Sequence, residues 1–117
     1  MRKIESRDSL PSELVLDLLL VLFEAPRGSA DLAEGVEALR GREVPLATFY
    51  RQLQKAVDAG WVETSELAPS ARSGPGRPER IYRISGDGER MLRLGLEPQR
   101  RRVARASSLG LLTEHAR

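Results

Sequence analysis

One segment near the middle of the chain, residues 45–62, constrains its fold more than any other. Its apolar side chains recur at helical spacing, and Gly60 is a typical residue for ending a helix. The residues after Gly60 open a run that is typical of a strand. Projected at about 100° per residue, the apolar side of this helix holds Leu46, Phe49, Leu53, Ala56 and Val57. The segment therefore predicts a helix with one buried face that leads directly into a strand.

A glycine- and proline-rich segment, residues 68–79, follows. It contains three prolines, two glycines and two arginines, a composition that excludes regular structure. Strands are predicted on either side of it, at residues 61–67 and 80–85. Together these segments predict a β-hairpin with an irregular, basic tip.

Two helices are predicted before residue 45. Residues 12–24 are apolar on almost every side, so they predict a helix that is surrounded by protein. Residues 29–41 predict a second helix, with Ser29 as its N-terminal cap and Gly41 as the residue that ends it. The apolar face of this second helix consists of Leu32, Val36 and Leu39.

The chain continues well past the hairpin. Asp87 is expected to cap a fourth helix, and Pro98 is expected to divide the C-terminal part into two helices. The sequence thus predicts a mainly α, α+β fold: a winged helix-turn-helix with a two-stranded wing and a C-terminal dimerisation helix. The expected parts are a flexible N-terminus at residues 1–9, a winged-helix DNA-binding domain at residues 10–86 and a helical dimerisation segment at residues 87–117.

Catalysis and metal binding have little support in the sequence. The chain has no cysteine and a single histidine, His115, which excludes disulfides, thiolate metal sites and histidine clusters. No serine has a plausible histidine partner. Gly74 and Gly76 are not followed by the Lys-Ser/Thr pair of a phosphate-binding loop. We therefore expect a protein that is not an enzyme and that uses no cofactor.

A membrane span and a secretory signal are not expected. Residues 14–23 are strongly apolar, but they include Asp17 and reach only about half of the roughly twenty residues that cross a bilayer. Acidic residues precede this run and no small-residue cleavage site follows it, so it does not fit a secretory signal. The expected location is the cytoplasm, with no membrane partner.

Charge is distributed unevenly along the chain. Residues 1–69 carry 8 basic and 12 acidic side chains, whereas residues 70–117 carry 11 basic and 5 acidic ones. All 11 of these later basic residues are arginines. Clustered arginine suggests a surface that faces phosphate groups. The alternative is that arginine simply replaces lysine, as it does in proteins of GC-rich genomes.

The polar side of the central helix and the tip of the hairpin carry groups that suit double-stranded DNA. Arginine and lysine can reach guanine edges or phosphates, glutamine can pair with adenine, and a glycine-proline loop lets its arginines approach the backbone or a minor groove. The candidate DNA contacts are Thr48, Tyr50, Arg51, Gln52, Lys55, Arg72, Arg77 and Arg80. The alternative is that these residues form the solvated faces of a core helix and an ordinary hairpin.

Five short motifs lie between residues 10 and 95: Pro11-Ser12-Glu13-Leu14, Thr48-Phe49-Tyr50-Arg51, Gly60-Trp61-Val62, Gly76-Arg77-Pro78 and Tyr82-Arg83-Ile84-Ser85. In this order they resemble the first helix, the recognition helix and the wing of the PadR family of bacterial transcriptional regulators. The resemblance implies a homodimeric repressor that binds specific DNA sequences and responds to phenolic or drug-like small molecules. Ser29-Ala30 stands where the family often has Gly-Tyr, and Pro98 falls inside the family's dimerisation helix.

The segment after the hairpin has more apolar residues than a small monomer can readily bury. We therefore expect a homodimer built from this segment, which would also bring two DNA-binding surfaces to two half-sites. The expected dimerisation residues are Met91, Leu92, Leu96, Val103, Leu109 and Leu112. The alternative is a short helix folded back on its own domain. A second functional hypothesis is a winged helix that binds protein without binding DNA.

The chain has a single tryptophan, Trp61, directly after Gly60. A position at the start of a strand and next to the end of a helix predicts that the indole is at least partly buried against that helix. The rival interpretation is an indole that stacks on a flat ligand.

Overall fold

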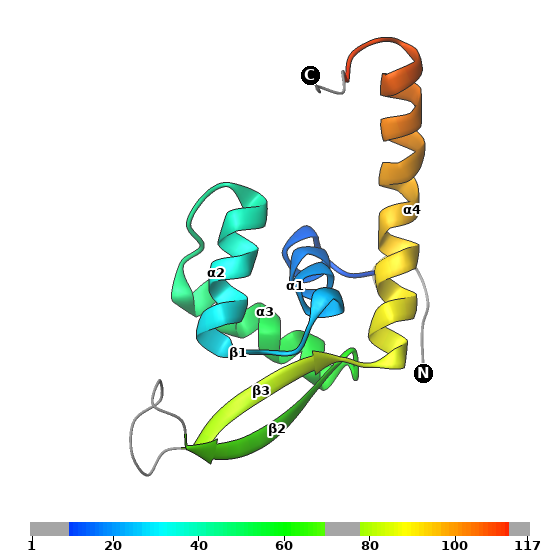
Figure 1. The fold of residues 1–117 in the computed structure, drawn as a ribbon. Coiled ribbons are helices and arrows are strands. Elements are labelled where there is room, and N and C mark those ends of the chain that lie inside the picture. Colours follow the sequence, from blue (N-terminus) through cyan, green and yellow to red (C-terminus); the bar gives the residue numbers. More distant parts are fainter. Residues whose placement is uncertain (1–9, 70–77, 113–117) are drawn as a thin grey trace.

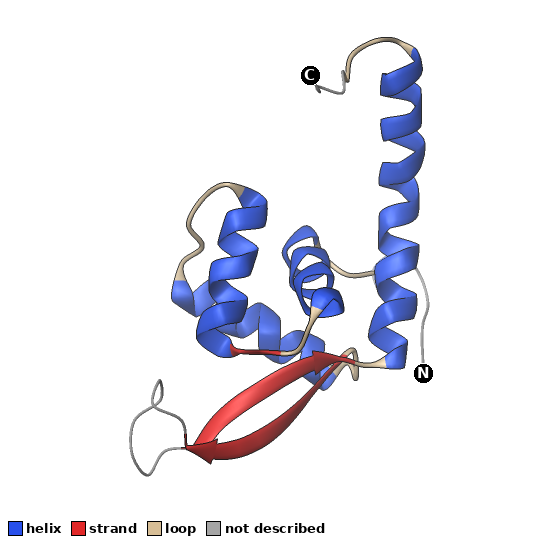
Figure 2. Ribbon diagram, viewed as in Figure 1, coloured by secondary structure: helices blue, strands red, loops and turns tan. Residues whose placement is uncertain are grey.

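A computed structural model describes residues 10–69 and 78–112 of the chain (Figure 1). These residues form four helices and a small three-stranded antiparallel sheet (Figure 2). In chain order the elements are α1 (Glu13–Glu24), β1 (Arg27–Gly28), α2 (Ser29–Arg40), α3 (Leu46–Asp58), β2 (Val62–Pro69), β3 (Pro78–Ile84) and α4 (Gly86–Ser108). The architecture is the predicted α+β winged helix. No helix among the described residues is long and apolar enough to cross a membrane.

Helix α1 lies at the centre of the core. It packs against α2, α3, β3 and α4, and Leu18 and Leu19 are completely buried. The predicted burial of this helix on most sides is confirmed. Ser12 caps the helix by accepting a hydrogen bond from the Val15 N–H at 3.3 Å, and Pro11 lies directly before this cap.

Helix α2 begins one residue earlier than a Ser29 cap would allow. Gly28 occupies the cap position and Ser29 is the first helical residue, so the predicted cap is wrong. Gly41 ends the helix at φ +76°, as predicted, and its N–H donates to the Glu37 carbonyl at 2.8 Å. Leu39 was expected on the buried face but is 48% exposed, because it borders an open groove between α1 and α2.

Helix α3 buries three of its five expected apolar residues, namely Phe49, Leu53 and Ala56. Val57 is half-buried against the core. Leu46, however, is 65% exposed, so its predicted place on the core face is wrong. Leu46 is the first residue of the helix and lies at the edge of the core, where the neighbouring elements no longer cover the helix.

The wing is a hairpin of β2 and β3, paired in antiparallel register from Val62↔Ile84 to Pro69↔Pro78. Its strands are longer than predicted, with an irregularity between residues 67 and 69. A third strand, β1, pairs with β3 and was not predicted. Two residues are too few to show the alternation of polar and apolar side chains by which a strand is recognised in a sequence.

Helix α4 begins at Gly86 and is capped by Ser85, whose hydroxyl oxygen accepts a hydrogen bond from the Gly88 N–H at 3.0 Å. The prediction of Asp87 as the cap is therefore wrong. The predicted division at Pro98 is also wrong, because one helix continues through it to Ser108. Proline has no backbone N–H and so removes one hydrogen bond from the helix. The helical turns before and after Pro98 are kept.

The start of α4 lies so close to the start of the wing that only glycine fits at position 88. A Cβ atom there would lie 2.2 Å from the backbone oxygen of Trp61, whereas a Cβ atom at Gly86 would meet nothing within 4 Å. The Gly88→Ala variant should therefore lose about 1–3 kcal/mol of unfolding free energy, since backbone must move. Gly86→Ala is the matched control and should be neutral or slightly stabilising. Chemical denaturation measures both, and equal stabilities would contradict this packing.

Candidate nucleic-acid interface

The outward side of α3 follows from the residues that it buries. Phe49, Leu53 and Ala56 face the core, so the side opposite to them is open to solvent. Arg51 and Lys55 are exposed on this side, as predicted. Thr48 and Gln52 are half-buried at its border. The expected contact residues thus lie along one flank of the open side, with Arg51 nearest its middle.

Gln52 lies closest to the rest of the protein. The Ser12 hydroxyl donates to the Gln52 Oε1 atom at 3.5 Å, which links α3 to the residue that caps α1. This contact is long for a hydrogen bond and partly exposed, so it leaves the Gln52 amide group available to another partner.

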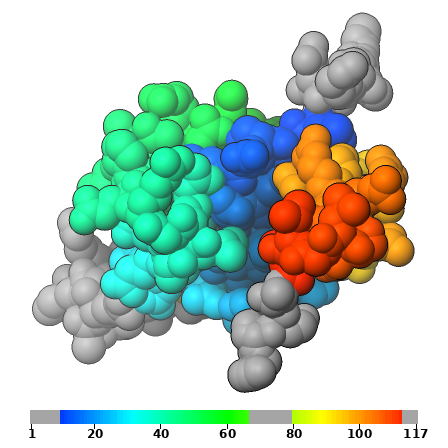
Figure 3. Space-filling view, turned by 90° about the horizontal axis from the view of Figure 1, so that it is seen from above, coloured from blue at the N-terminus to red at the C-terminus, as the bar shows by residue number. Residues whose placement is uncertain are grey.

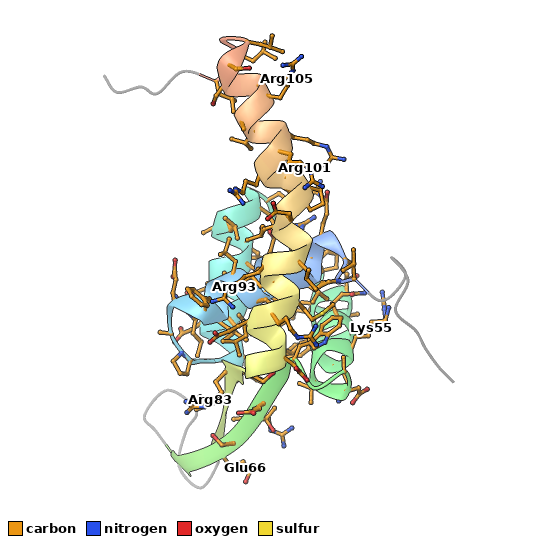
Figure 4. The ribbon with its side chains drawn as sticks, turned by 90° about the vertical axis from the view of Figure 1, so that its right-hand side faces the viewer. Lys55, Glu66, Arg83, Arg93, Arg101 and Arg105 are labelled. Carbon is orange, nitrogen blue, oxygen red and sulfur yellow. The ribbon has the colours of Figure 1, made fainter. Side chains whose placement is uncertain are left out.

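Arg51 and Lys55 carry charges that the described part of the protein does not neutralise. The ion pairs among residues 10–69 and 78–112 involve neither side chain. Figure 4 shows Lys55 projecting from α3 into solvent. Two exposed cations on one helix face are suited to an anionic partner.

Tyr50 lies at the edge of the core. Its ring packs edge-on against Phe49, with the ring centroids 5.1 Å apart and an angle of 75° between the planes. Its hydroxyl lies 3.4 Å from the Ser29 hydroxyl on α2. The side chain is still 45% exposed, so it adds a polar and aromatic group to the open side of α3.

Four exposed residues of α3 were absent from the predicted contacts. They are Leu46, Ala47, Gln54 and Asp58. The Gln54 Nε2 atom donates to the Asp58 carboxylate at 2.9 Å. A projection centred on Phe49, Leu53 and Ala56 alone places Ala47, Gln54 and Asp58 on the open side, because the inclusion of Leu46 and Val57 turned the predicted core face away from its true direction.

The wing contributes a mixed charge. Arg80 is exposed, and its guanidinium lies 3.5 Å from the Glu66 carboxylate of the opposite strand. Arg83 is also exposed and lies opposite Glu63 in the hairpin register. Figure 4 shows Glu66 and Arg83 on the wing below α4. Arg72 and Arg77, the other predicted contacts of the hairpin, lie outside the described residues.

Helix α4 uses only its first half to pack on the body. Met91 and Leu92 are buried in the subunit itself, and Leu96 is half-buried against the core. Val103, Leu109 and Leu112 are more than half exposed. The second half of the helix rises beyond the other helices (Figure 1), and its C-terminal turns lie at the surface (Figure 3). Of the expected dimerisation residues, these last three have surface free for a partner.

The arginines of α4 do not extend the surface of α3 and the wing. Arg101 and Arg105 lie toward the end of α4 that is opposite to the wing (Figure 4). They share this end with Arg100 and Arg102, which are exposed as well. The charge of these four arginines is therefore separate from the candidate interface.

A cleft of about 500 Å³ lies between the start of α1 and the end of α3. Its lining residues are Leu10, Pro11, Ser12, Val15, Gln52, Lys55, Ala59 and Trp61. Trp61 is half-buried and packs against the core, which confirms its predicted burial. Among the described residues, no group of three or more His, Cys, Asp or Glu side chains is placed to hold a metal ion.

A scan against protein-family models and a search of curated proteins find no match to this chain. Solved structures do match. A transcriptional regulator from Thermoplasma acidophilum is 19% identical with a TM-score of 0.63, over 86% of this chain and 91% of its own. A PadR-like transcription factor from Bacteroides fragilis is 21% identical with a TM-score of 0.62, over 81% and 86%. The fold is that of the PadR-like winged-helix regulators.

Another match is the PadR protein of Bacillus subtilis, whose structure was determined in complex with operator DNA. It is 17% identical with a TM-score of 0.62, and the match covers 73% of this chain but 47% of that protein. The common part therefore spans about half of that PadR protein. At this level of identity the similarity concerns the fold alone. Helix α3 and the wing are parts of this fold in the present chain.

The packing of Trp61 can be measured. Because the indole packs against the core beside the cleft between α1 and α3, Trp61→Ala should cost about 3 kcal/mol of unfolding free energy. Leu111→Ala, which truncates a residue that is 73% exposed, is the control and should change stability by less than about 0.5 kcal/mol. Thermal unfolding distinguishes the variants. An unchanged melting temperature in Trp61→Ala would favour the rival interpretation of the indole as a stacking surface for a ligand.

Proposed function

We propose that this protein is a sequence-specific, double-stranded DNA-binding transcriptional regulator. The observation that carries the proposal is the open side of α3, where Arg51 and Lys55 have no carboxylate partner among the described residues. The fold that presents this side is shared with a PadR protein bound to operator DNA. A helix of this kind fits the major groove, where hydrogen-bonding side chains distinguish base pairs.

The contacts divide by their positions on α3. Arg51 lies nearest the middle of the open side and would reach a guanine edge. Thr48 and Gln52 lie on the flank, where Gln52 would read adenine or hydrogen-bond the backbone. Lys55 and the Tyr50 hydroxyl would bind phosphates, and the wing arginines, Arg72, Arg77 and Arg80, would hold the neighbouring backbone or minor groove.

The proposed regulator acts as a homodimer in the cytoplasm, and it is not an enzyme. The exposed apolar residues on the second half of α4 support this assembly, because a helix that extends beyond its own core has apolar surface for a second copy. Two copies would present two copies of α3 to the half-sites of a palindromic operator. Binding there would occlude a promoter, and a small-molecule effector would release the repressor by changing the spacing of the two helices.

Removal of Arg51 tests the DNA-binding surface. A site selected from random duplexes should bind Arg51→Ala about 10- to 100-fold more weakly, the equivalent of about 1–3 kcal/mol for one base contact. Binding to random duplexes should fall less. Arg105→Ala removes the same charge from the far end of α4 and should bind the site like the wild type.

Fluorescence anisotropy at several salt concentrations measures these affinities. A salt-dependent affinity also separates this function from that of a winged helix that binds protein alone. Equal binding of the selected site by the wild type and a Thr48/Arg51/Gln52 triple alanine variant would exclude α3 as the reading helix.

Negative charges introduced on α4 test the proposed dimer surface. Val103→Glu with Leu109→Glu places two carboxylates on the exposed apolar surface of α4 and should give a monomer with weaker operator binding. Gln99→Glu changes an exposed residue of the same helix and should leave the dimer intact. Light scattering gives the mass of each variant, and circular dichroism reports whether the fold is kept. A double variant that stays dimeric would place the interface elsewhere.

A further inference from the structure

The first turn of α3 is apolar and open. Leu46 is 65% exposed, and Ala47 beside it is exposed as well. Leu46 is not recruited into the core, although it belongs to the most amphipathic stretch of the chain. An exposed leucine is unremarkable by itself, so its meaning depends on what lies next to it.

Ala47 continues the open side of α3 toward its N-terminus, and Leu46 lies beside it at the first helical position, on the edge nearer Tyr50. Ala47 lies four residues before Arg51, and Leu46 lies four residues before Tyr50. Side chains at this spacing are neighbours on one helix face. The start of the helix therefore exposes two apolar groups, and the next turn carries Tyr50 at the border of the open side and Arg51 on that side.

The position matters because the N-terminal residues of a recognition helix are those that contact base edges in the major groove. In that groove, the C5-methyl group of thymine is the apolar feature that side chains read. A leucine at the first position of this helix that enters the groove would remove its own surface and that methyl group from water together, which favours thymine at this position.

From this juxtaposition we infer that Leu46, assisted by Ala47, is a specificity residue that selects a thymine methyl group in the operator. The inference rests on the proposed DNA-binding function and deepens it. It predicts that part of the base readout is apolar, next to the hydrogen-bonding readout by Arg51. A thymine should therefore be required within a few base pairs of the guanine that Arg51 contacts.

The experiment uses the full chain and its selected operator duplex, in which each thymine is replaced in turn by deoxyuridine. Uracil keeps the base pairing and the hydrogen-bonding groups of thymine and removes the methyl group alone. The wild type should lose about threefold to tenfold in affinity at one position per half-site, the expected effect of one buried methyl group. Other positions should be unaffected.

Variants at position 46 test whether Leu46 causes the loss of affinity for uracil. Leu46→Ala should bind the thymine operator more weakly and should bind thymine and uracil equally at the sensitive position. Leu46→Met keeps the apolar surface and should keep the discrimination. Leu39→Ala removes an exposed leucine of the groove between α1 and α2, outside both proposed surfaces, and should discriminate like the wild type.

The experiment distinguishes a failure of the proposed DNA-binding function from a failure of the apolar readout by Leu46. If the wild type selects no site from random duplexes, the proposed function itself is overturned. If it selects a site but tolerates uracil at every thymine, the apolar readout is overturned while DNA binding stands. Discrimination that persists in Leu46→Ala would likewise remove Leu46 from the readout. Thermal unfolding of each variant establishes that its fold is intact.

Discussion

Ser85 joins the end of α3, the base of the wing and the start of α4. Its hydroxyl donates to the Gly60 carbonyl at 2.6 Å and accepts from the Gly88 N–H at 3.0 Å, while its own N–H donates to the Trp61 carbonyl at 2.9 Å. The residue is 8% exposed, so these bonds are shielded from water. Loss of the hydroxyl would leave buried polar groups without partners. The direction in which α3 and the wing point relative to α4 therefore depends on this one side chain.

The charges of α3 and the wing are moderate compared with those at the far end of α4. On the wing, Glu63 and Glu66 lie opposite Arg83 and Arg80, so the described part of the hairpin is nearly neutral. The arginines at the end of α4 act on that surface only weakly, because salt screens exposed charges beyond about 8–10 Å. Base contacts from α3 and the hairpin tip are therefore expected to determine the choice of DNA more than long-range attraction does.

The sequence predicted what local periodicity and glycine control. Phe49, Leu53 and Ala56 gave the buried face of α3, and Gly41 and Gly60 mark ends of helices with φ at +76° and +83°. Four helices and the hairpin could be recognised in the same way. The candidate contacts on α3 were found as a face, though turned toward the flank occupied by Thr48 and Gln52.

The remaining features depend on contacts between distant segments. Ser85 and Asp87 are both suitable caps, and the partner that selects Ser85 is the Gly60 carbonyl, 25 residues away. Strand β1 exists because β3 pairs with it. The exposure of Leu46 depends on where the core ends, which periodicity within α3 does not show. Such choices become visible only when the elements are packed together.

The continuity of α4 through Pro98 has a geometric consequence for a dimer. From Leu92, its last fully buried residue, to Ser108 the helix rises by about 24 Å at roughly 1.5 Å per residue. Proline is costly inside a helix, yet a helix that is not divided keeps its exposed leucines at a fixed distance from Ser85. Two copies that met through this part of α4 would hold their α3 helices apart by rigid arms. Half-sites one turn apart require recognition helices about 34 Å from each other, and an undivided helix fixes such a distance better than a hinge at Pro98 would.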